Sequence, residues 1–381
     1  MTSRRGYLSR VPPRHVYVHV PFCARRCSYC DFAIAVRSRV PSDEFVRAVD
    51  RELQLRSLGD PPTSVETIYL GGGTPSRLGA DAVARLLDVV RRRFPPEPGS
   101  EITIEANPDD VTTAAVAEWC AAGVNRVSLG VQSFDDSALA WMHRTHDAAR
   151  VDAAVSGLRE GGMENWSLDL IFALPAELQR DWPRDLDRAV ALDPPHISLY
   201  GLTVEAHTPI AHWRDRGATV EGTEDAYEHE YLIADSTLRE AGYVHYEVSN
   251  FGREGRASRH NRGYWTGVSY VGLGPAAHGY DGEVRRWNER EYAAWLARIH
   301  AGEDPIGGHE RLTVENRVAE GVYLGLRTID GLHVSPLELG TVRAWVDAGW
   351  AMSDSEIVRL TPTGWLRLDA LASSLTAFRS R

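Results

Sequence analysis

Residues 17–30 read Tyr17-Val-His-Val-Pro-Phe-Cys23-Ala-Arg-Arg-Cys27-Ser-Tyr-Cys30, an apolar run followed directly by three cysteines. Three cysteines leave an odd thiol in any disulfide pairing. A structural zinc site needs a fourth ligand, and no second Cys or His pair follows. Soft thiolates also suit iron–sulfur clusters, which normally take four of them. A cluster held by three cysteines therefore keeps one iron with an open position.

The Cys-x3-Cys-x2-Cys spacing behind an apolar strand resembles the radical SAM superfamily. In that superfamily the amino and carboxylate groups of S-adenosylmethionine (SAM) chelate the open iron, and an injected electron splits the sulfonium. The resemblance implies that Cys23, Cys27 and Cys30 hold a [4Fe–4S] cluster. The alternatives are a zinc knuckle or chance clustering. Cys120 stands on an apolar helical face, which is typical of core packing, and is expected to have no role.

Composition and charge exclude several classes of protein. The chain has 381 residues, of which 43% are hydrophobic, enough for two or three domains or one large α/β body with an appendage. Its net charge of −11 argues against nucleic acid as a partner. We find no signal-peptide apolar region and no apolar stretch of membrane-spanning length. Because clustered free thiols need a reducing compartment, we expect a cytoplasmic protein.

The first half of the chain alternates short apolar strands with amphipathic helices, which predicts a parallel sheet with right-handed crossovers. The predicted strands are His15–Val20, Val65–Leu70, Glu101–Glu105, Arg126–Gly130, Trp166–Phe172 and His196–Leu202. The predicted helices are Asp43–Leu58, Ala80–Phe94, Thr113–Ala122, Ala148–Gly161 and Trp182–Leu192. An open doubly wound sheet fits this order too. Polar or glycine clusters at the strand ends favour an α/β fold built on a partial (β/α)6 TIM-like barrel.

Three domains are expected. Residues 1–222 form the partial barrel with the cluster and SAM site, and 223–309 form an extension. Residues 310–381 carry helices at Val314–Leu326, Pro336–Gly349 and Trp365–Phe378 and a strand at Glu356–Leu360. This order predicts a small α+β, winged-helix-like module. Because the module is not basic, we interpret it as a lid or a partner surface rather than a DNA-binding domain.

Several strand ends offer groups that suit a polar cofactor. Gly71-Gly-Gly-Thr-Pro75 allows close approach of a ligand to the backbone, although a tight turn also explains it. Glu105 could cap a helix or bind SAM. Gln132 ends a strand and Arg144 is expected on the following helix, where both could face the barrel mouth. Asp169 within an apolar strand needs a partner, either SAM or a helix N-terminus.

A second constellation is His260-Asn-Arg-Gly-Tyr-Trp265, expected on a loop. It combines a histidine, which is a common axial ligand of haem iron, with two large aromatic residues that could stack on a porphyrin. The alternative is a loop histidine bonded to the backbone. The glycines of Gly272–Gly279 indicate close backbone approach.

Taken together, these motifs resemble the oxygen-independent coproporphyrinogen III oxidase family, and within it the HemW branch of radical SAM haem chaperones. The similarity includes Tyr17–Cys23, Gly71–Ser76, Glu105–Pro108, Gly130–Phe134, Asp169–Ile171, Leu174-Pro175, His260–Trp265 and Gly272–Gly279. It implies that SAM is held by Tyr17, Gly72, Gly73, Thr74, Glu105, Gln132, Arg144 and Asp169. It also implies a haem site at His260, Asn261, Tyr264 and Trp265.

Two features distinguish the branches of this family. The oxidases carry a further cysteine two residues after the third ligand, where this chain has Phe32, and the His-Asn-x-x-Tyr-Trp segment belongs to the chaperone branch. The resemblance therefore implies a haem chaperone that passes haem to an acceptor protein, such as a respiratory enzyme that would bring it transiently near a membrane. An electron donor such as flavodoxin or ferredoxin is implied as well, and SAM cleavage stays feasible.

Three alternatives remain open at this point. One is oxidative decarboxylation of two propionates of coproporphyrinogen III. Another is a radical SAM enzyme that opens the porphyrin ring. The last is a structural iron–sulfur or zinc protein without haem, which leaves Gly71–Ser76, Gln132 and Arg144 unexplained.

Overall fold

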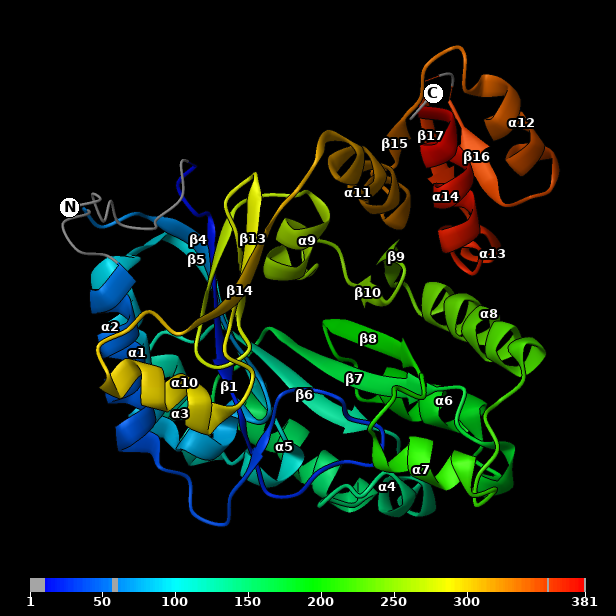
Figure 1. Ribbon diagram of the computed structural model, residues 1–381. Coiled ribbons are helices and arrows are strands. Elements are labelled where there is room, and N and C mark those ends of the chain that lie inside the picture. Colours follow the sequence, from blue (N-terminus) through cyan, green and yellow to red (C-terminus); the bar gives the residue numbers. More distant parts are fainter. Residues whose placement is uncertain (1–10, 57–60, 355, 380–381) are drawn as a thin grey trace. The chain divides into compact units, whose positions relative to one another are not determined.

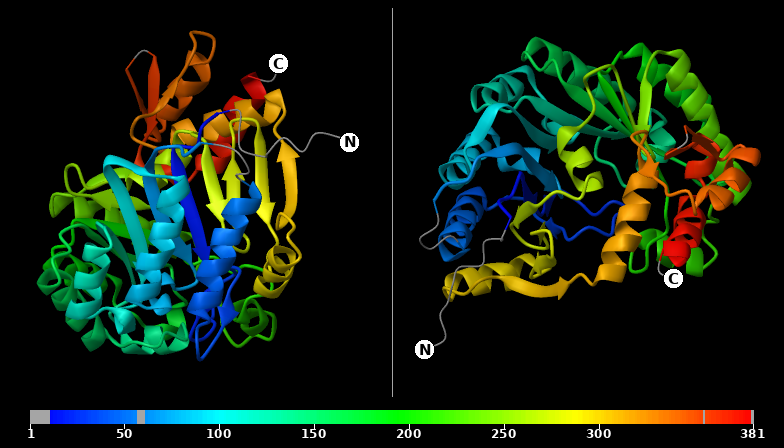
Figure 2. Two further views of the ribbon diagram at one scale, coloured as in Figure 1. Left: turned by 90° about the vertical axis from the view of Figure 1, so that its left-hand side faces the viewer. Right: turned by 90° about the horizontal axis from the view of Figure 1, so that it is seen from above.

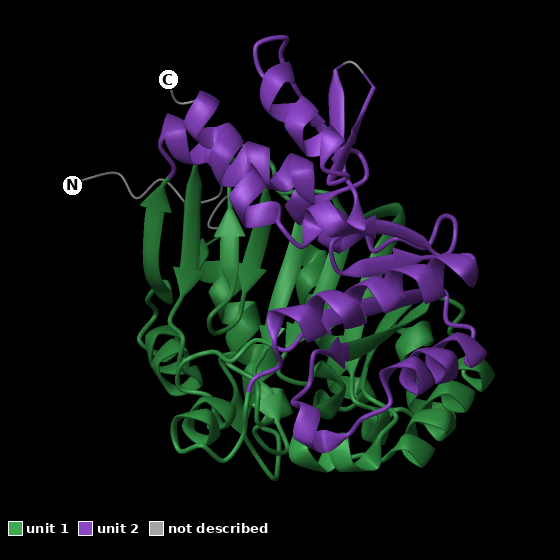
Figure 3. Cartoon of the chain, turned by 90° about the vertical axis from the view of Figure 1, so that its right-hand side faces the viewer, with its two compact units in different colours: residues 1–170, 203–220, 268–311 green, residues 171–202, 221–267, 312–381 purple. Residues whose placement is uncertain are grey.

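The computed structural model describes residues 11–56, 61–354 and 356–379. The chain forms two compact units (Figure 3). Unit 1 comprises residues 1–170, 203–220 and 268–311, and unit 2 comprises residues 171–202, 221–267 and 312–381. The two units are described one after the other.

Unit 1 is built on a sheet whose central strands are parallel (Figure 1). Its strands follow the order β1 (His15–Val20), β4 (Val65–Gly72), β5 (Pro96–Ala106), β6 (Arg126–Gln132) and β7 (Trp166–Phe172). The register pairs Val18 with Leu70, and Leu70 with Ile104. These strands are rich in buried Val, Ile and Leu, as expected for parallel strands covered on both faces.

The same sheet continues on the other side of β1. There β11 (Tyr270–Leu273) pairs with β1 in parallel, and β12 (His278–Tyr280), β13 (Val284–Asn288) and β14 (Ile306–Arg311) follow in antiparallel order. Residues 268–311 thus extend the sheet of the N-terminal strands.

Helices α1 (Ser42–Arg56), α2 (Ala80–Arg93) and α3 (Thr113–Ala121) lie on one face of the strands of unit 1 (Figure 2). Each follows a strand, and their apolar faces supply buried residues such as Val49, Leu86 and Trp119. The other elements of unit 1 are β2 (Phe22–Cys23), β3 (Ala35–Val36), η1 (Pro75–Leu78), η2 (Pro108–Asp110), α4 (Asp136–Trp141), α5 (Ala148–Glu160), α7 (Pro209–Asp215) and α10 (Tyr292–His300).

Unit 2 begins with η3 (Ala176–Leu178), α6 (Trp182–Ala191) and β8 (His196–Gly201), which continue the β/α alternation along the chain. β8 pairs antiparallel with β10 (Asn250–Gly252), which pairs antiparallel with β9 (Val244–Glu247). Helices α8 (Glu224–Glu240) and α9 (Arg259–Trp265) belong to the same unit.

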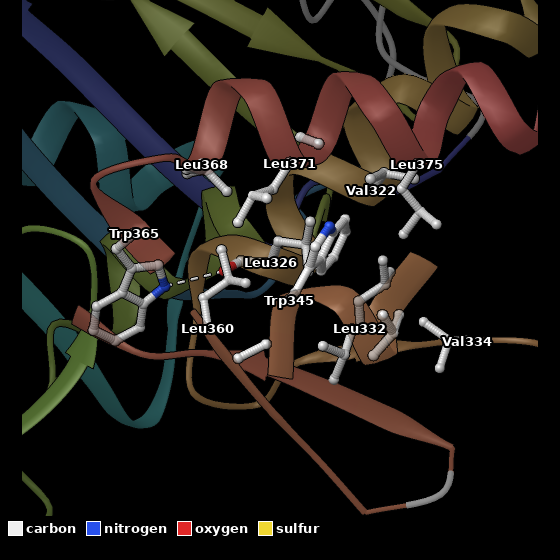
Figure 4. Close-up of a cluster of buried hydrophobic side chains, with 14 residues drawn as sticks. Val322, Leu326, Leu332, Val334, Trp345, Leu360, Trp365, Leu368, Leu371 and Leu375 are labelled. Carbon is white, nitrogen blue, oxygen red and sulfur yellow. Dashed lines mark hydrogen bonds between the residues drawn. The ribbon is translucent and has the colours of Figure 1, made fainter. Parts of the chain in front are cut away.

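The C-terminal part of unit 2 forms a small module of helices and short strands. It runs α11 (Val314–Arg327), β15 (Leu332–His333), α12 (Leu339–Asp347), β16 (Ala351–Ser353), β17 (Ile357–Leu360), α13 (Pro362–Trp365) and α14 (Leu368–Arg379). The strands form an antiparallel sheet of order β15-β17-β16. Buried side chains from α11, α12, the strands and α14 form its core (Figure 4). In this core the Trp365 indole donates a hydrogen bond to the Leu326 carbonyl at 3.0 Å.

The predicted strands are all present, with β5 longer than expected. Two local predictions were wrong. Residues 259–265 form helix α9 rather than a loop, because the Ser258 side chain caps it by accepting from the Asn261 amide. Arg144 lies in the connection between α4 and α5 rather than on a helix, since α4 ends at Trp141. The division at residues 222 and 309 stays a prediction.

Candidate functional site

The cysteine loop follows β1, and a short two-stranded sheet joins its two sides. β2 and β3 pair in parallel, with Cys23 opposite Val36, and the Arg37 amide donates to the Cys23 carbonyl at 2.9 Å. Cys23, Cys27 and Cys30 are half-buried and carry free thiols. Burial raises the pKa of the Cys30 thiol to about 11. Binding to iron would offset the cost of forming a buried thiolate, because metal ligation favours deprotonation.

Within the described residues, no group of three or more His, Cys, Asp or Glu side chains could hold a single metal ion. A [4Fe–4S] cluster takes each thiolate on a different iron, so its ligands stand apart. Three neighbouring free thiols match the ligand number that leaves one iron of a cluster with an open position.

Arg144 links the cysteine loop to the strand ends. Its Nη1 lies 3.5 Å from Cys27 Sγ, and its Nη2 donates to Asn107 Oδ1 at 2.6 Å and to the Gly130 carbonyl at 2.7 Å. The Nε–H is buried and, within the described part of the chain, has no hydrogen-bond partner. A half-buried guanidinium with a spare donor is suited to a carboxylate.

Gly72 at the end of β4 and Gly73 directly after it are required by packing within the protein itself. Gly72 has φ of +113°, and a Cβ at this position would lie 2.6 Å from the His19 ring. A Cβ at Gly73 would lie 2.7 Å from the backbone of Pro21. The Gly73 amide donates to the Val20 carbonyl at 2.8 Å. Thr74 follows, and its Oγ1 lies 3.6 Å from Cys23 Sγ.

Glu105, at the end of β5, is the centre of a hydrogen-bonded group. Its carboxylate accepts from Tyr69 Oη at 2.8 Å and from the Gly72 amide at 2.9 Å. The Tyr69 ring stacks on Tyr17, with ring centroids 6.1 Å apart. Burial, with a smaller contribution from the charge of Asp169, raises the pKa of Glu105 to about 7.

The next two strands contribute Gln132 and Asp169. Gln132 has φ of +70°, which is uncommon for a residue other than glycine, and the β6–β7 register shifts at this point. Such strained backbone often occurs at functional sites. The Asp169 carboxylate accepts from Ser128 Oγ at 2.9 Å. This half-buried acid therefore has a partner on the neighbouring strand β6.

The arrangement has the charges of a site for a cationic amino acid derivative. Glu105 and Asp169 supply two acidic groups, of which Asp169 helps to raise the pKa of Glu105, and Arg144 supplies a half-buried cation. A ligand with two positive groups and a carboxylate would balance the two acidic groups and the arginine. The predicted residues on or directly after β1, β4, β5, β6 and β7 lie within this one unit.

Sequence reasoning missed the residues that hold these groups in position. Tyr69 and Ser128 lie within strands and read as ordinary β-sheet residues, while Asn107 reads as part of a turn. The one sequence signal for Tyr69 and Ser128 is the alternation of side chains along a strand, which puts residues two apart on the same face. Tyr69 lies two residues from Gly71, and Ser128 lies two residues from Gly130. Burial lowers the pKa of His19 to about 4, so its ring stays neutral and contacts Tyr17 Oη and the Ala33 carbonyl.

The second constellation lies in unit 2, on α9. His260 is 1% exposed, and its Nε2 lies 2.9 Å from Tyr264 Oη one turn along the helix. The Trp265 ring packs under the Arg327 guanidinium at 4.1 Å. Its indole N–H is buried and has no hydrogen-bond partner among the described residues. Asn261 is half-buried, and its backbone N–H donates a hydrogen bond to Ser258 Oγ.

Known proteins resemble this chain over nearly its whole length. Residues 17–189 match the Radical SAM superfamily. A Mycobacterium tuberculosis protein named heme chaperone HemW is 37% identical over 369 residues, which cover 95% of each chain. The Escherichia coli protein of that name is 37% identical over 285 residues, covering 73% of this chain and 74% of its own. The chain belongs to the HemW family of radical SAM proteins.

Membership of the radical SAM superfamily implies a [4Fe–4S] cluster and SAM as cofactors. A solved structure of the Escherichia coli coproporphyrinogen III oxidase HemN, a radical SAM enzyme, matches with a TM-score of 0.81. The match covers 97% of this chain and 91% of that one at 22% identity, so it shows the shared fold. In the described part of this HemW-family chain, no helix is both long enough and apolar enough to cross a membrane.

Proposed function

We propose that this chain is a haem chaperone that binds haem and transfers it to an acceptor protein. The observation that carries the proposal is its similarity to proteins named heme chaperone HemW, which extends over 95% of both chains. Phe32 supports it, because the oxidases of the wider family have a cysteine at this position.

Cys23, Cys27 and Cys30 would hold the [4Fe–4S] cluster in this proposal. SAM would be held by Tyr17, Gly72, Gly73, Thr74, Glu105, Gln132, Arg144 and Asp169. When bound, the two cofactors supply an open iron and a sulfonium that one electron can cleave. Arg144 would bind the carboxylate of SAM, since its Nε–H is unpartnered among the described residues. Glu105 and Asp169 would balance its positive charges.

Haem would bind at α9, through His260, Asn261, Tyr264 and Trp265. His260 would have to exchange its contact with Tyr264 Oη for the haem iron, and the two side chains lie one turn apart. The buried indole N–H of Trp265 offers a donor that has no partner within the described residues. The Trp265 and Tyr264 rings are large enough to cover one face of a porphyrin.

The proposed partners follow from the same chemistry. They are haem, an acceptor protein such as a respiratory enzyme, and an electron donor such as flavodoxin or ferredoxin. The acceptor would bring the chain transiently close to a membrane. We propose that the chain acts in the cytoplasm, because free cysteines and a cluster with an open iron need a reducing compartment.

The test is an anaerobic comparison of two activities in one preparation. The cluster-reconstituted chain receives SAM, a low-potential reductant and coproporphyrinogen III, and protoporphyrinogen IX is the readout. Haem affinity and haem transfer to an apo-acceptor are measured in parallel. We expect haem binding and transfer without turnover. Sustained production of protoporphyrinogen IX, with SAM binding verified, would show that the chain is a coproporphyrinogen III oxidase and would contradict the chaperone proposal.

A further inference from the structure

The cysteine loop carries unpaired positive charge in an otherwise acidic protein. Between Ala24 and Arg39 the sequence has four arginines, Arg25, Arg26, Arg37 and Arg39, against one acid, Asp31, while the whole chain has a net charge of −11. All four arginines are exposed, and none has an ion pair within the described part of the chain. Exposed arginines elsewhere, such as Arg85 and Arg311, pair with carboxylates.

Backbone contacts bring the four arginines together around one cysteine. Arg25 and Arg26 lie between Cys23 and Cys27 in the sequence. The β2–β3 pairing sets Cys23 opposite Val36, and the Arg37 amide donates to the Cys23 carbonyl at 2.9 Å. Arg77 Nη2 in turn donates to the Arg37 carbonyl at 3.1 Å, which fixes this end of the loop. Both pairs of arginines therefore flank Cys23.

Exposed apolar side chains stand among these charges. Phe32 is 61% exposed and Val36 is 45% exposed, although both are large hydrophobic residues of a short, well-tethered loop. An apolar centre with an arginine-rich rim is the composition of a protein–protein interface. Interfaces of electron-transfer complexes are small, so a single loop can supply most of one.

We propose that residues 24–39 are the docking surface for a small acidic electron-transfer protein that reduces the cluster. The inference rests on the proposed function, which places the cluster on this loop. A basic surface on an acidic protein attracts and orients an acidic partner, and repulsion from the remaining surface favours this one orientation. A donor on this loop is also closest to the cluster, because the loop itself carries the three cysteines.

The proposed reaction is the transfer of one electron from the donor to the cluster. The donor loses it and the cluster gains it, while no bond breaks and no proton has to move. The one co-reactant is the donor, a low-potential flavoprotein or iron–sulfur protein with an acidic surface.

Charge reversal tests the surface. An acidic flavodoxin in its fully reduced state is the probe, and its affinity for the full-length chain is measured by biolayer interferometry at low and high salt, with and without reconstituted cluster. R25E/R26E and R37E/R39E are each expected to weaken binding about tenfold or more at low salt and to flatten its salt dependence. R92E/R159E is the matched control, because it makes the same change in net charge at exposed sites in the last turns of α2 and α5.

A rate measurement separates docking from loss of the cluster. Cluster reduction by flavodoxin should slow in both loop variants, while reduction by dithionite stays at the wild-type rate. The iron content and the haem affinity of both loop variants should match those of the wild type. A failure of the haem-chaperone proposal would therefore be distinguishable from a failure of the docking proposal. Equal weakening in R92E/R159E, or no flavodoxin binding by the wild type at low salt, would overturn the proposal. Loss of binding to phosphatidylglycerol vesicles alone would assign the arginines to a membrane surface instead.

Discussion

Glu105 is the residue whose charge state we expect to control SAM binding. Its pKa of about 7 means that the carboxyl is half-protonated near neutral pH. A cationic ligand favours the carboxylate, so SAM affinity should be high above this pKa and should fall as the pH drops through it. The measurement is isothermal titration calorimetry of SAM with cluster-loaded protein between about pH 6 and 8.5.

Two variants make this assignment testable. E105Q should bind SAM at least about tenfold more weakly at high pH, which corresponds to the loss of one charge-assisted hydrogen bond. It should also keep only the pH dependence of SAM itself. Y69F removes a hydrogen bond that lowers the pKa of Glu105, so its midpoint should move to higher pH. A midpoint that is unchanged in both variants contradicts the role of Glu105.

Gly72 is the second residue whose substitution has a defined consequence. In G72A the backbone is strained at φ of +113°, and the new methyl group meets the His19 ring at 2.6 Å. Gly79 also has a positive φ, of +83°, but a Cβ there has open space around it. G79A should therefore show only the backbone cost of about 1–3 kcal/mol, and G72A a larger loss. The measurement is the free energy of unfolding in urea.

A third variant separates steric overlap from strain. H19A/G72A removes the ring that the methyl group would meet, so part of the loss in G72A should be recovered. If G72A and G79A cost the same, the glycine is needed for its backbone angle alone and not for contact with β1.

At the scale of elements, the sequence was informative where a segment's structure is decided locally. Strands such as β1 and β7 could be predicted because their apolar runs are buried on both faces. The short strand β11 could not, because it pairs with β1, more than two hundred residues earlier in the chain. The site shows the same contrast. The cysteine spacing is local, while the contacts of Arg144 with Asn107 and Cys27 join distant segments.

The C-terminal module offers a prediction about packing. Leu326 on α11 is 0% exposed in the core that Figure 4 shows, whereas Leu337, before α12, is 80% exposed. L326A should cost about 2–5 kcal/mol, since it removes buried methyl groups and leaves a cavity. L337A should cost within about 0.5 kcal/mol. Hydrogen exchange of the module's amides measures both, and equal protection in the two variants would contradict the assigned core.

At the scale of the whole molecule, the candidate cofactor residues and the candidate haem residues belong to different units. The predicted cluster and SAM ligands lie in unit 1, and His260–Trp265 lies in unit 2. Each unit has its own buried residues, so a substitution in one should leave binding in the other intact. C27S is expected to lose the cluster and keep haem affinity. H260A is expected to lose haem affinity and keep the cluster and SAM binding.

Iron and sulfide analysis, SAM titration and the haem Soret band, measured on the same preparations, test this separation. H229A, which removes an exposed histidine on α8 of the same unit, is the control for H260A. If H260A keeps the Soret band and haem affinity, His260 serves only its contact with Tyr264, and α9 is not the haem site. If C27S loses haem binding while circular dichroism shows it folded, haem binding depends on the cluster. Transfer would then have to be explained by coupling between the units rather than by two separate sites.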